Sequence, residues 1–130
     1  MSRMTGLVTG IVKDVDDPQN QGRIQVDYPT FEGRSRTAWM PIAMPMAGNN
    51  RGMAFMPEID DEAVVGFLSG DADQPVALGC TWNGKDLSPS SHPRERIIRS
   101  YNGHVIRMID SPKGAQGAGS ITIADANGNK

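Results

Sequence analysis

The sequence predicts an all-β protein, and three observations lead to this class. Glycine and proline together make up 24 of the 130 residues, 15 Gly and 9 Pro, so the chain is interrupted often. No window of about 11 residues or more repeats apolar side chains at the spacing of an amphipathic helix. Short apolar runs alternate instead with clusters of Gly, Pro, Asn and Asp, as in strands joined by turns.

Composition excludes several classes of protein. The net charge of −2 argues against binding nucleic acid through a general positive field. No apolar stretch approaches the roughly 20 residues of a membrane helix. A single cysteine, Cys80, excludes an internal disulfide and a Cys-based zinc site. The N-terminus has no cleavable signal pattern, so we expect the chain to be made in a reducing cytoplasm.

The first two predicted strands form a hairpin. Residues 7–15 are apolar on both faces, as in a curled or closed sheet, and Gly10 in their middle suggests a bend or bulge. Turn-forming residues over 16–22 precede a second strand over 23–28. In that strand the apolar side chains alternate with polar ones and should face one way: Ile24, Val26 and Tyr28.

The following runs complete the predicted barrel. We predict in order a polar connector over 30–35, a strand over 37–42, a loop over 44–51, a short strand over 52–56, an acidic turn over 58–61, and strands over 62–68 and 75–81. In the last strand Val76, Leu78 and Cys80 share one face, so Cys80 is interpreted as a buried structural thiol. About five strands with a glycine kink in the first are typical of a small Greek-key barrel of the OB type.

A change of composition over 83–93 divides the chain. We predict a barrel over 1–86, a linker over 87–95 and a different structure over 96–130. Strands are expected over 96–100, 104–109 and 120–124, with turns over 101–103, 111–119 and 125–128. Three short strands cannot bury a core of their own, and they leave open edges. This part must therefore dock on the barrel or associate with other chains.

Several sequence blocks resemble one known family. Residues 57–79 match a sequence signature in both order and spacing. The matching positions are a proline at the start, then Asp61-Glu62, Phe67, Gly70-Asp71 and Pro75-Val76. Residues 22–26, 38–43 and 82–84 resemble its second strand, third strand and domain end. In this order the blocks resemble the phage baseplate assembly protein V family, which includes contractile-tail hubs and the VgrG spikes of type VI secretion. Asp60 replaces the family's usual Gly, and Ala63 its usual Val.

Residues 100–110 resemble the first strands of that family's β needle, Ser-x-x-Gly-His-x-Ile-x-x-x-Asp, and residues 121–129 resemble the next strand and turn. The resemblance implies an OB-type barrel followed by the root of a trimeric β needle or prism. The apolar residues expected to bury between chains are Ile97, Ile98, Val105, Ile106, Met108, Ile109, Ile121 and Ile123.

The function implied by this resemblance is structural. The chain would be a hub or spike of a contractile injection machine: a phage baseplate, a type VI-like system or an extracellular injection particle. Its partners would be two further copies in a homotrimer, tail tube or hub proteins, and a PAAR-like tip protein. It would be assembled in the bacterial cytoplasm, delivered outward on contraction, and would contact the target membrane only mechanically. The alternative is a monomeric OB module that binds single-stranded nucleic acid or oligosaccharide.

No catalytic residue, metal ligand or cofactor is predicted. His92 and His104 leave little for His-dependent catalysis, and no nucleophile with a base and an orienting group is visible. The carboxylates at 58 and 60–62 are interpreted as a solvated turn rather than a cation site, which needs about six converging oxygens. Asp71 is interpreted as a turn residue whose side chain accepts from nearby backbone amides.

Two clusters of side chains, one of methionines and one of arginines, each allow two interpretations. The methionines between positions 40 and 56 predict either an adaptable binding surface or packing beneath the barrel: Met40, Met44, Met46, Met53 and Met56. Four arginines in the C-terminal part are interpreted as forming interchain salt bridges or a solvated face rather than as binding phosphates: Arg94, Arg96, Arg99 and Arg107.

Overall fold

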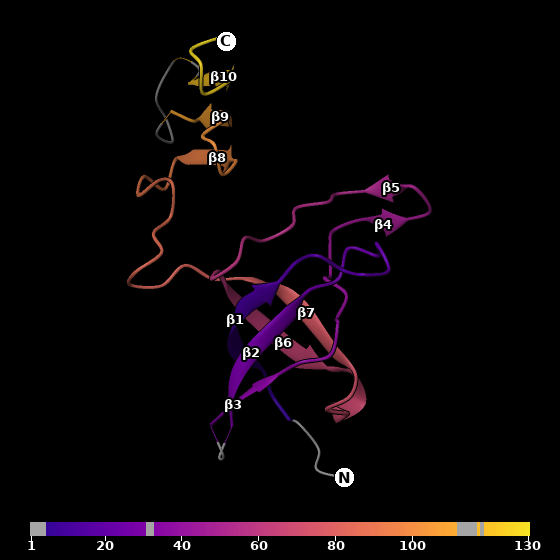
Figure 1. The fold of residues 1–130 in the computed structure, drawn as a ribbon. Coiled ribbons are helices and arrows are strands. Elements are labelled where there is room, and N and C mark those ends of the chain that lie inside the picture. The colour runs from indigo at the N-terminus through magenta and orange to yellow at the C-terminus, as the bar shows by residue number, and fades with distance from the viewer. Residues whose placement is uncertain (1–4, 31–32, 112–116, 118) are drawn as a thin grey trace. The chain divides into compact units, whose positions relative to one another are not determined.

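Among the residues that the structure describes, the regular elements are β-strands and one short 3₁₀ turn, which confirms the all-β class (Figure 1). The structure is a computed structural model that describes residues 5–30, 33–111, 117 and 119–130. The chain divides into two compact units, Met1–Asp86 and Leu87–Lys130. Within the described residues, no helix has the length and apolar character needed to cross a membrane.

The first unit contains a five-stranded antiparallel sheet in the order β3-β2-β1-β6-β7. Its strands are β1 (Val8–Asp14), β2 (Gln25–Thr30), β3 (Gly33–Arg36), β6 (Glu62–Phe67) and β7 (Pro75–Cys80), and the 3₁₀ turn η1 (Leu68–Gly70) joins the last two.

Residues 40–43 close this sheet into a barrel. Ile24, just before β2, exchanges backbone hydrogen bonds with Met40 at 2.9 and 3.0 Å. On the other side, Ala77 of β7 donates to the Pro41 carbonyl at 3.0 Å and accepts from the Ala43 N–H at 2.8 Å. The segment thus links β7 to the start of β2 and closes the sheet at this point.

The barrel core draws on β1, β2, β6, β7 and the closing segment. Its residues are at most 1% exposed: Val12, Ile24, Val26, Met40, Ala63, Val65 and Ala77. Val8, Val15, Ile42 and Phe67 pack against it. The predicted inward face of β2 is confirmed, and the half-buried Tyr28 makes an edge-to-face contact with Phe67, with ring centroids 6.1 Å apart.

The strand predicted over 37–42 is wrong. The third strand is β3, which overlaps the predicted connector and extends one residue beyond it, and Ser35 in β3 pairs with Tyr28 of β2. Residues 37–42 contribute only single bridges at Met40 and Ile42, since Pro41 has no N–H to extend a ladder. The loop over 44–51 and the strand over 52–56 are also wrong, because a two-rung hairpin of β4 (Ala47–Gly48) and β5 (Arg51–Gly52) spans their boundary.

Gly10 makes room for a neighbouring strand rather than forming a bulge. A Cβ atom at this position would lie 2.4 Å from Val26 Cγ1 and 2.5 Å from the Asp27 carbonyl oxygen. The β1–β2 register is irregular only between Val12 and Asp14. The absence of a side chain at Gly10 therefore lets β1 and β2 approach closely.

The predicted inward face of β7 is also wrong. Pro75 and Ala77 point into the core, whereas Leu78 is 48% exposed and Cys80 is exposed. The register with β6 shifts opposite Val64 and Val65, which leaves Leu78 as the extra residue of a bulge. Cys80 is therefore not the buried thiol that the alternation predicts.

The second unit is a three-stranded antiparallel sheet in the order β10-β9-β8. The strands are β8 (Glu95–Arg99), β9 (Val105–Ile109) and β10 (Ser120–Ala124), within one residue of the predicted ranges. Gly103, with φ of 96°, lies in the turn between β8 and β9, where a residue without a Cβ is favoured. The turn predicted over 111–119 lies largely outside the described residues.

Candidate interaction surfaces

The sheet of the second unit has one predominantly apolar face. In an antiparallel sheet, directly paired residues point to the same side. The register pairs Ile98 with Ile106 and Ile106 with Ile123, and it pairs Arg96 with Met108 and Met108 with Ile121. One face, which we call the isoleucine face, therefore carries Ile98, Ile106, Met108, Ile121 and Ile123 together with Arg96.

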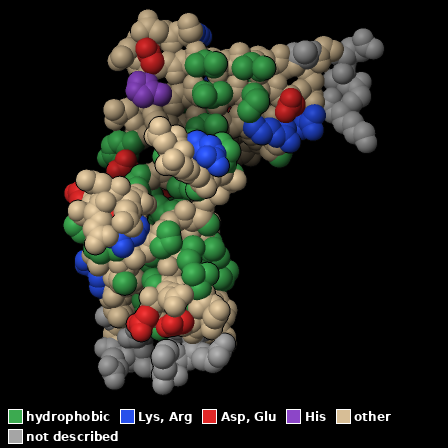
Figure 2. Space-filling model, turned by 90° about the vertical axis from the view of Figure 1, so that its right-hand side faces the viewer, with side chains coloured by type: hydrophobic (Ala, Val, Ile, Leu, Met, Phe, Trp, Pro, Cys, Tyr) green, Lys and Arg blue, Asp and Glu red, His purple; other side chains and the backbone are tan. Residues whose placement is uncertain are grey.

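The isoleucine face is open to solvent in the isolated chain. Its apolar side chains range from 39% exposed at Met108 to 75% exposed at Ile121. Figure 2 shows hydrophobic side chains gathered in groups on this unit rather than scattered singly. The single charge on this face, Arg96, donates from Nη1 to Asp110 Oδ2 at 2.8 Å. The face therefore has no unpaired charge to oppose contact with another apolar surface.

The opposite face of the same sheet is mixed in character. It carries Ile97, Val105 and Ile109 beside Glu95, Arg99 and Arg107. Arg107 Nε lies 3.7 Å from Glu95 Oε2. The eight residues predicted from sequence as one interface are thus divided, five on the isoleucine face and three on this one. Within the chain, Arg96 and Arg107 have carboxylate partners, and Arg94 donates from Nη2 to the Ser111 carbonyl.

Side-chain hydrogen bonds fix the end of this sheet near the β9–β10 pair. The Ala126 N–H donates to His104 Nδ1 at 3.0 Å. Asp125 Oδ1 accepts the N–H groups of Asn127 and Asn129 at 2.9 and 3.0 Å. The hydrogen bond from the Asn129 side chain lowers the pKa of Asp125 from its ordinary value. His104 therefore acts here as a turn acceptor.

A second candidate surface is the arm, which we define as residues 43–57. It leaves the barrel after Ile42, bears the β4–β5 hairpin, and returns before β6 (Figure 1). The structure divides the methionines of this region. Met40 is completely buried in the core, whereas Met46, Met53 and Met56 are 53%, 40% and 43% exposed. Packing beneath the barrel is therefore confirmed for Met40, and the binding surface stays a prediction for the exposed methionines.

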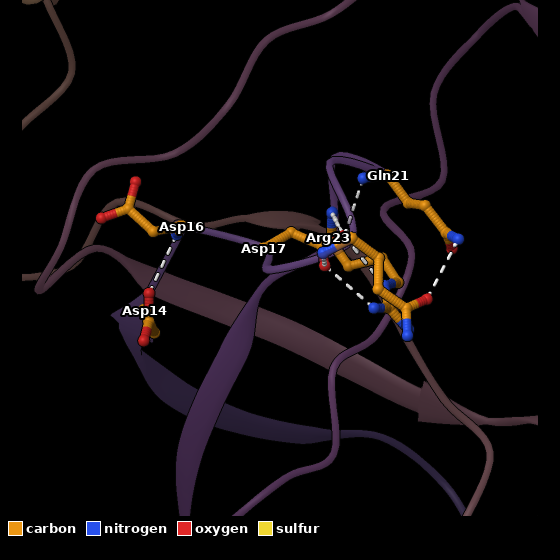
Figure 3. Close-up of polar contacts among 6 residues, drawn as sticks. Asp14, Asp16, Asp17, Gln21 and Arg23 are labelled. Carbon is orange, nitrogen blue, oxygen red and sulfur yellow. Dashed lines mark hydrogen bonds and ion pairs between the residues drawn. The ribbon is translucent and has the colours of Figure 1, made fainter.

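Asp17 organises the loop between β1 and β2, a role that sequence reasoning missed (Figure 3). Its carboxylate accepts the backbone N–H groups of Gln19, Gln21 and Arg23 at 2.9, 3.0 and 3.2 Å. It also accepts Arg23 Nε and Nη2 at 2.8 and 2.9 Å. The Arg23 contact is the main cause that holds the pKa of Asp17 well below its usual range. The sequence pattern that could have indicated this role is an aspartate at the start of a polar loop that ends in an arginine.

The acidic turn before β6 uses its carboxylates in local contacts. Asp61 Oδ2 accepts the Glu58 N–H at 3.0 Å, and Asp60 Oδ1 lies 3.6 Å from Lys13 Nζ. Glu62 accepts from Thr81 Oγ1 and Asn83 Nδ2 at 2.9 and 2.8 Å. In the part of the chain that the structure describes, no three His, Cys, Asp or Glu side chains form a metal-binding group.

Asp71 Oδ1 accepts the Asp73 N–H at 2.9 Å, which confirms the predicted turn. Asp60, where the resembled family usually has glycine, has φ of 78° and donates its N–H to the Val12 carbonyl. The turn thus keeps the left-handed conformation that glycine favours. Although Cys80 is exposed, partial desolvation of its thiol, followed by the charge of Asp61, raises the pKa of the thiol, which opposes thiolate reactivity.

Comparison with known proteins agrees with this architecture. Residues 8–82 match the family described as the type VI secretion system and phage-baseplate injector OB domain. The type VI secretion spike proteins VgrG5 and VgrG4b of Pseudomonas aeruginosa are 26% and 29% identical over 97% and 100% of this chain. VgrG3 of Vibrio cholerae is 31% identical over 62% of it.

The chain spans only 16% of the length of VgrG5 and of VgrG4b, and 9% of that of VgrG3. The family match, however, covers the whole of the closed barrel from β1 to the residues after β7. The match extends over more than half of the sequence and coincides with a five-stranded barrel of the expected type. This chain therefore belongs to the family of type VI secretion and phage-baseplate injector proteins that carry an OB domain.

Proposed function

We propose that this chain is a structural hub or spike component of a contractile injection machine, and that it joins the tail tube to the membrane-puncturing tip. Membership of the injector family supports the class of machine. The observation that carries the structural role is the isoleucine face, which leaves five large apolar side chains exposed on a small sheet. A sheet of this kind is completed by other protein surfaces rather than by a substrate.

The partners proposed for this sheet are two further copies of the chain. Five residues at about 3.3 Å and three strands at about 4.8 Å give a face of roughly 240 Å². A stable interface buries about 800 Å² of each partner, so this face alone is too small and the edges of the sheet must contribute as well. Three copies about a three-fold axis give each sheet two neighbours. They also bring the outer edges of β8 and β10 near other strands, which would cover both edges.

The proposed mechanism is mechanical. Strand pairing and apolar packing between copies would make the needle root rigid, and the barrels would surround the axis and dock on the tail tube. A tip protein of the PAAR-like class would continue the needle. We propose assembly in the bacterial cytoplasm and outward delivery on contraction. The role requires no catalytic group from this chain.

Sedimentation of the intact chain over a range of concentrations tests this proposal. We expect a species of three chains. Met108 and Ile109 are adjacent, 39% and 38% exposed, and on opposite faces, so they provide matched variants. Met108→Lys should weaken association at least about tenfold, or about 1.4 kcal/mol, whereas Ile109→Lys should weaken it less.

Two outcomes would contradict the proposal. A wild-type chain that stays monomeric at every concentration refutes self-association by this unit. Equal effects of the two lysine substitutions refute the assignment of the isoleucine face as the buried one. Salt-sensitive binding of a single-stranded oligonucleotide by the monomer would support an OB module for nucleic acid instead.

A further inference from the structure

The arm and the adjoining barrel surface form an apolar groove that the trimer proposal does not use. Its volume is about 550 Å³, within the range of pockets that hold small ligands or short peptide segments. The barrel contributes Gln21, Gly22, Pro41 and Ile42, and the arm contributes the rest of the lining, including the exposed methionines. Methionine side chains adapt to irregular partners because they are unbranched and flexible.

The part of the arm that follows β5 and leads back to the barrel has unpaired backbone groups beside this groove. The N–H of Met53 donates to the Met46 carbonyl at 3.1 Å, which is the last rung below the β4–β5 hairpin. Beyond it, no described residue bonds to the N–H groups of Ala54, Phe55 and Met56 or to their carbonyls. Phe55 is 54% exposed. An extended segment with free N–H and carbonyl groups can pair with another strand through backbone hydrogen bonds.

One charge in the groove indicates the chemistry of its occupant. Arg51 is the single charged residue among the 14 that line the groove. Its guanidinium lies against Gly48, where a Cβ atom would be 2.5 Å from Arg51 Cζ. No carboxylate of a described residue lies within ion-pair distance of it. A carboxylate from outside the chain would therefore complement the groove.

We propose that the arm groove binds an extended apolar segment bearing an acidic side chain, supplied by another protein of the particle. The segment adds as a strand along residues 54–56, its apolar side chains contact Met46, Met53 and Met56, and its carboxylate pairs with Arg51. The groove is too small for a globular face, which favours a short segment. This inference is independent of the trimer, because the groove lies entirely within the barrel unit.

Methyl NMR of the intact chain, labelled at the methionine ε-carbons, tests this inference. The probes are two synthetic tetrapeptides, acetyl-Glu-Val-Leu-Val-amide and its analogue with Lys in place of Glu. We expect the acidic peptide to shift the methyl signals of Met46, Met53 and Met56 with a dissociation constant of about 1 mM. Met40 in the core is the internal control and should not move.

Two variants separate the charge from the backbone contribution. Arg51→Glu should weaken binding of the acidic peptide at least about tenfold and restore binding of the lysine peptide. Ala54→Pro removes one free N–H and should weaken binding of the acidic peptide without a change of charge. Equal affinity for both peptides, or no shift at about 10 mM peptide, overturns the proposal. Shifts of the same methyls that depend on protein concentration alone would show a second copy as the occupant and also overturn it.

Discussion

Substitution of Gly10 by alanine tests how tightly the barrel closes. The added Cβ would lie 2.4 Å from Val26 Cγ1 and 2.5 Å from the backbone carbonyl oxygen of Asp27. The backbone oxygen cannot rotate away, so β1 and β2 must separate by about 1 Å to restore ordinary contact. Overpacking of this kind costs about 1–3 kcal/mol. We expect about 2–3 kcal/mol for Gly10→Ala, because the obstacle is backbone.

Gly66→Ala is the matched control in the same barrel. Its added Cβ would meet Leu7 Cδ2 at 3.4 Å and Leu78 Cδ1 at 3.6 Å, which are ordinary contacts with side chains. Gly66 has no positive φ, so alanine should leave stability unchanged or raise it by about 0.4–1 kcal/mol. Trp39 and Trp82 both lie in the barrel unit, so tryptophan fluorescence during urea unfolding reports this unit.

Two results would contradict this expectation. Gly10→Ala could unfold at the wild-type urea midpoint, which would show that β1 and β2 separate at no cost. Alternatively, both alanine variants could be destabilised equally, which would show that the close approach at Gly10 is not the cause. A loss of 2–3 kcal/mol corresponds to a fall in melting temperature of about 8–24 °C for a unit of this size.

Three further substitutions test polar and backbone features of the barrel. Because the folded-state pKa of Asp17 is depressed, its carboxylate stabilises the fold above the ordinary pKa of 3.8, and this contribution is lost as pH falls below that value. The urea midpoint of Asp17→Asn should therefore change less below about pH 4 than that of the wild type. Thr37→Val leaves the buried Val26 N–H without the Thr37 Oγ1 acceptor at 3.0 Å and should cost about 1–3 kcal/mol in urea unfolding, whereas Thr37→Ser retains the bond and should cost less. Asp60→Gly relieves a left-handed residue and should be neutral or stabilising by up to about 1 kcal/mol in the same assay, and a clear loss would contradict this.

Alternation and turn residues were sufficient to locate the strands with apolar side chains. They located β1, β6, β7 and the three strands of the second unit to within one or two residues. They missed β3, because Gly33–Arg36 is polar throughout and pairs only along β2. Its strand character comes from backbone pairing across the hairpin, which leaves no period of two in the side chains. They also placed a strand over 37–42, where apolar residues close the barrel without forming a continuous ladder.

The sequence identified the apolar residues of the second unit but not how they divide between faces. Within one strand, adjacent residues such as Ile97 and Ile98 must point to opposite sides. The register between β8 and β9 decides which residues of β9 share a face with Ile97 and which share a face with Ile98. A shift of one residue would exchange these two groups of β9 residues. The pairing of Ile98 with Ile106 settles this, and the isoleucine face follows from it. The arm groove depends on where the chain folds back, so no local pattern indicates it.

The wrong inward face of β7 shows what limits inference from hydrophobicity in a small closed barrel. Leu78 is more hydrophobic than Ala77, yet Ala77 is 1% exposed and Leu78 is 48% exposed. Ala77 faces the core at the point where Pro41 and Ala43 bond to its backbone and close the barrel. Gly10 and Ala63 are also buried, which fits an interior whose side chains must alternate in size. Where a barrel closes, the space available decides which residue is buried, and a small residue can replace a larger one on the inner face.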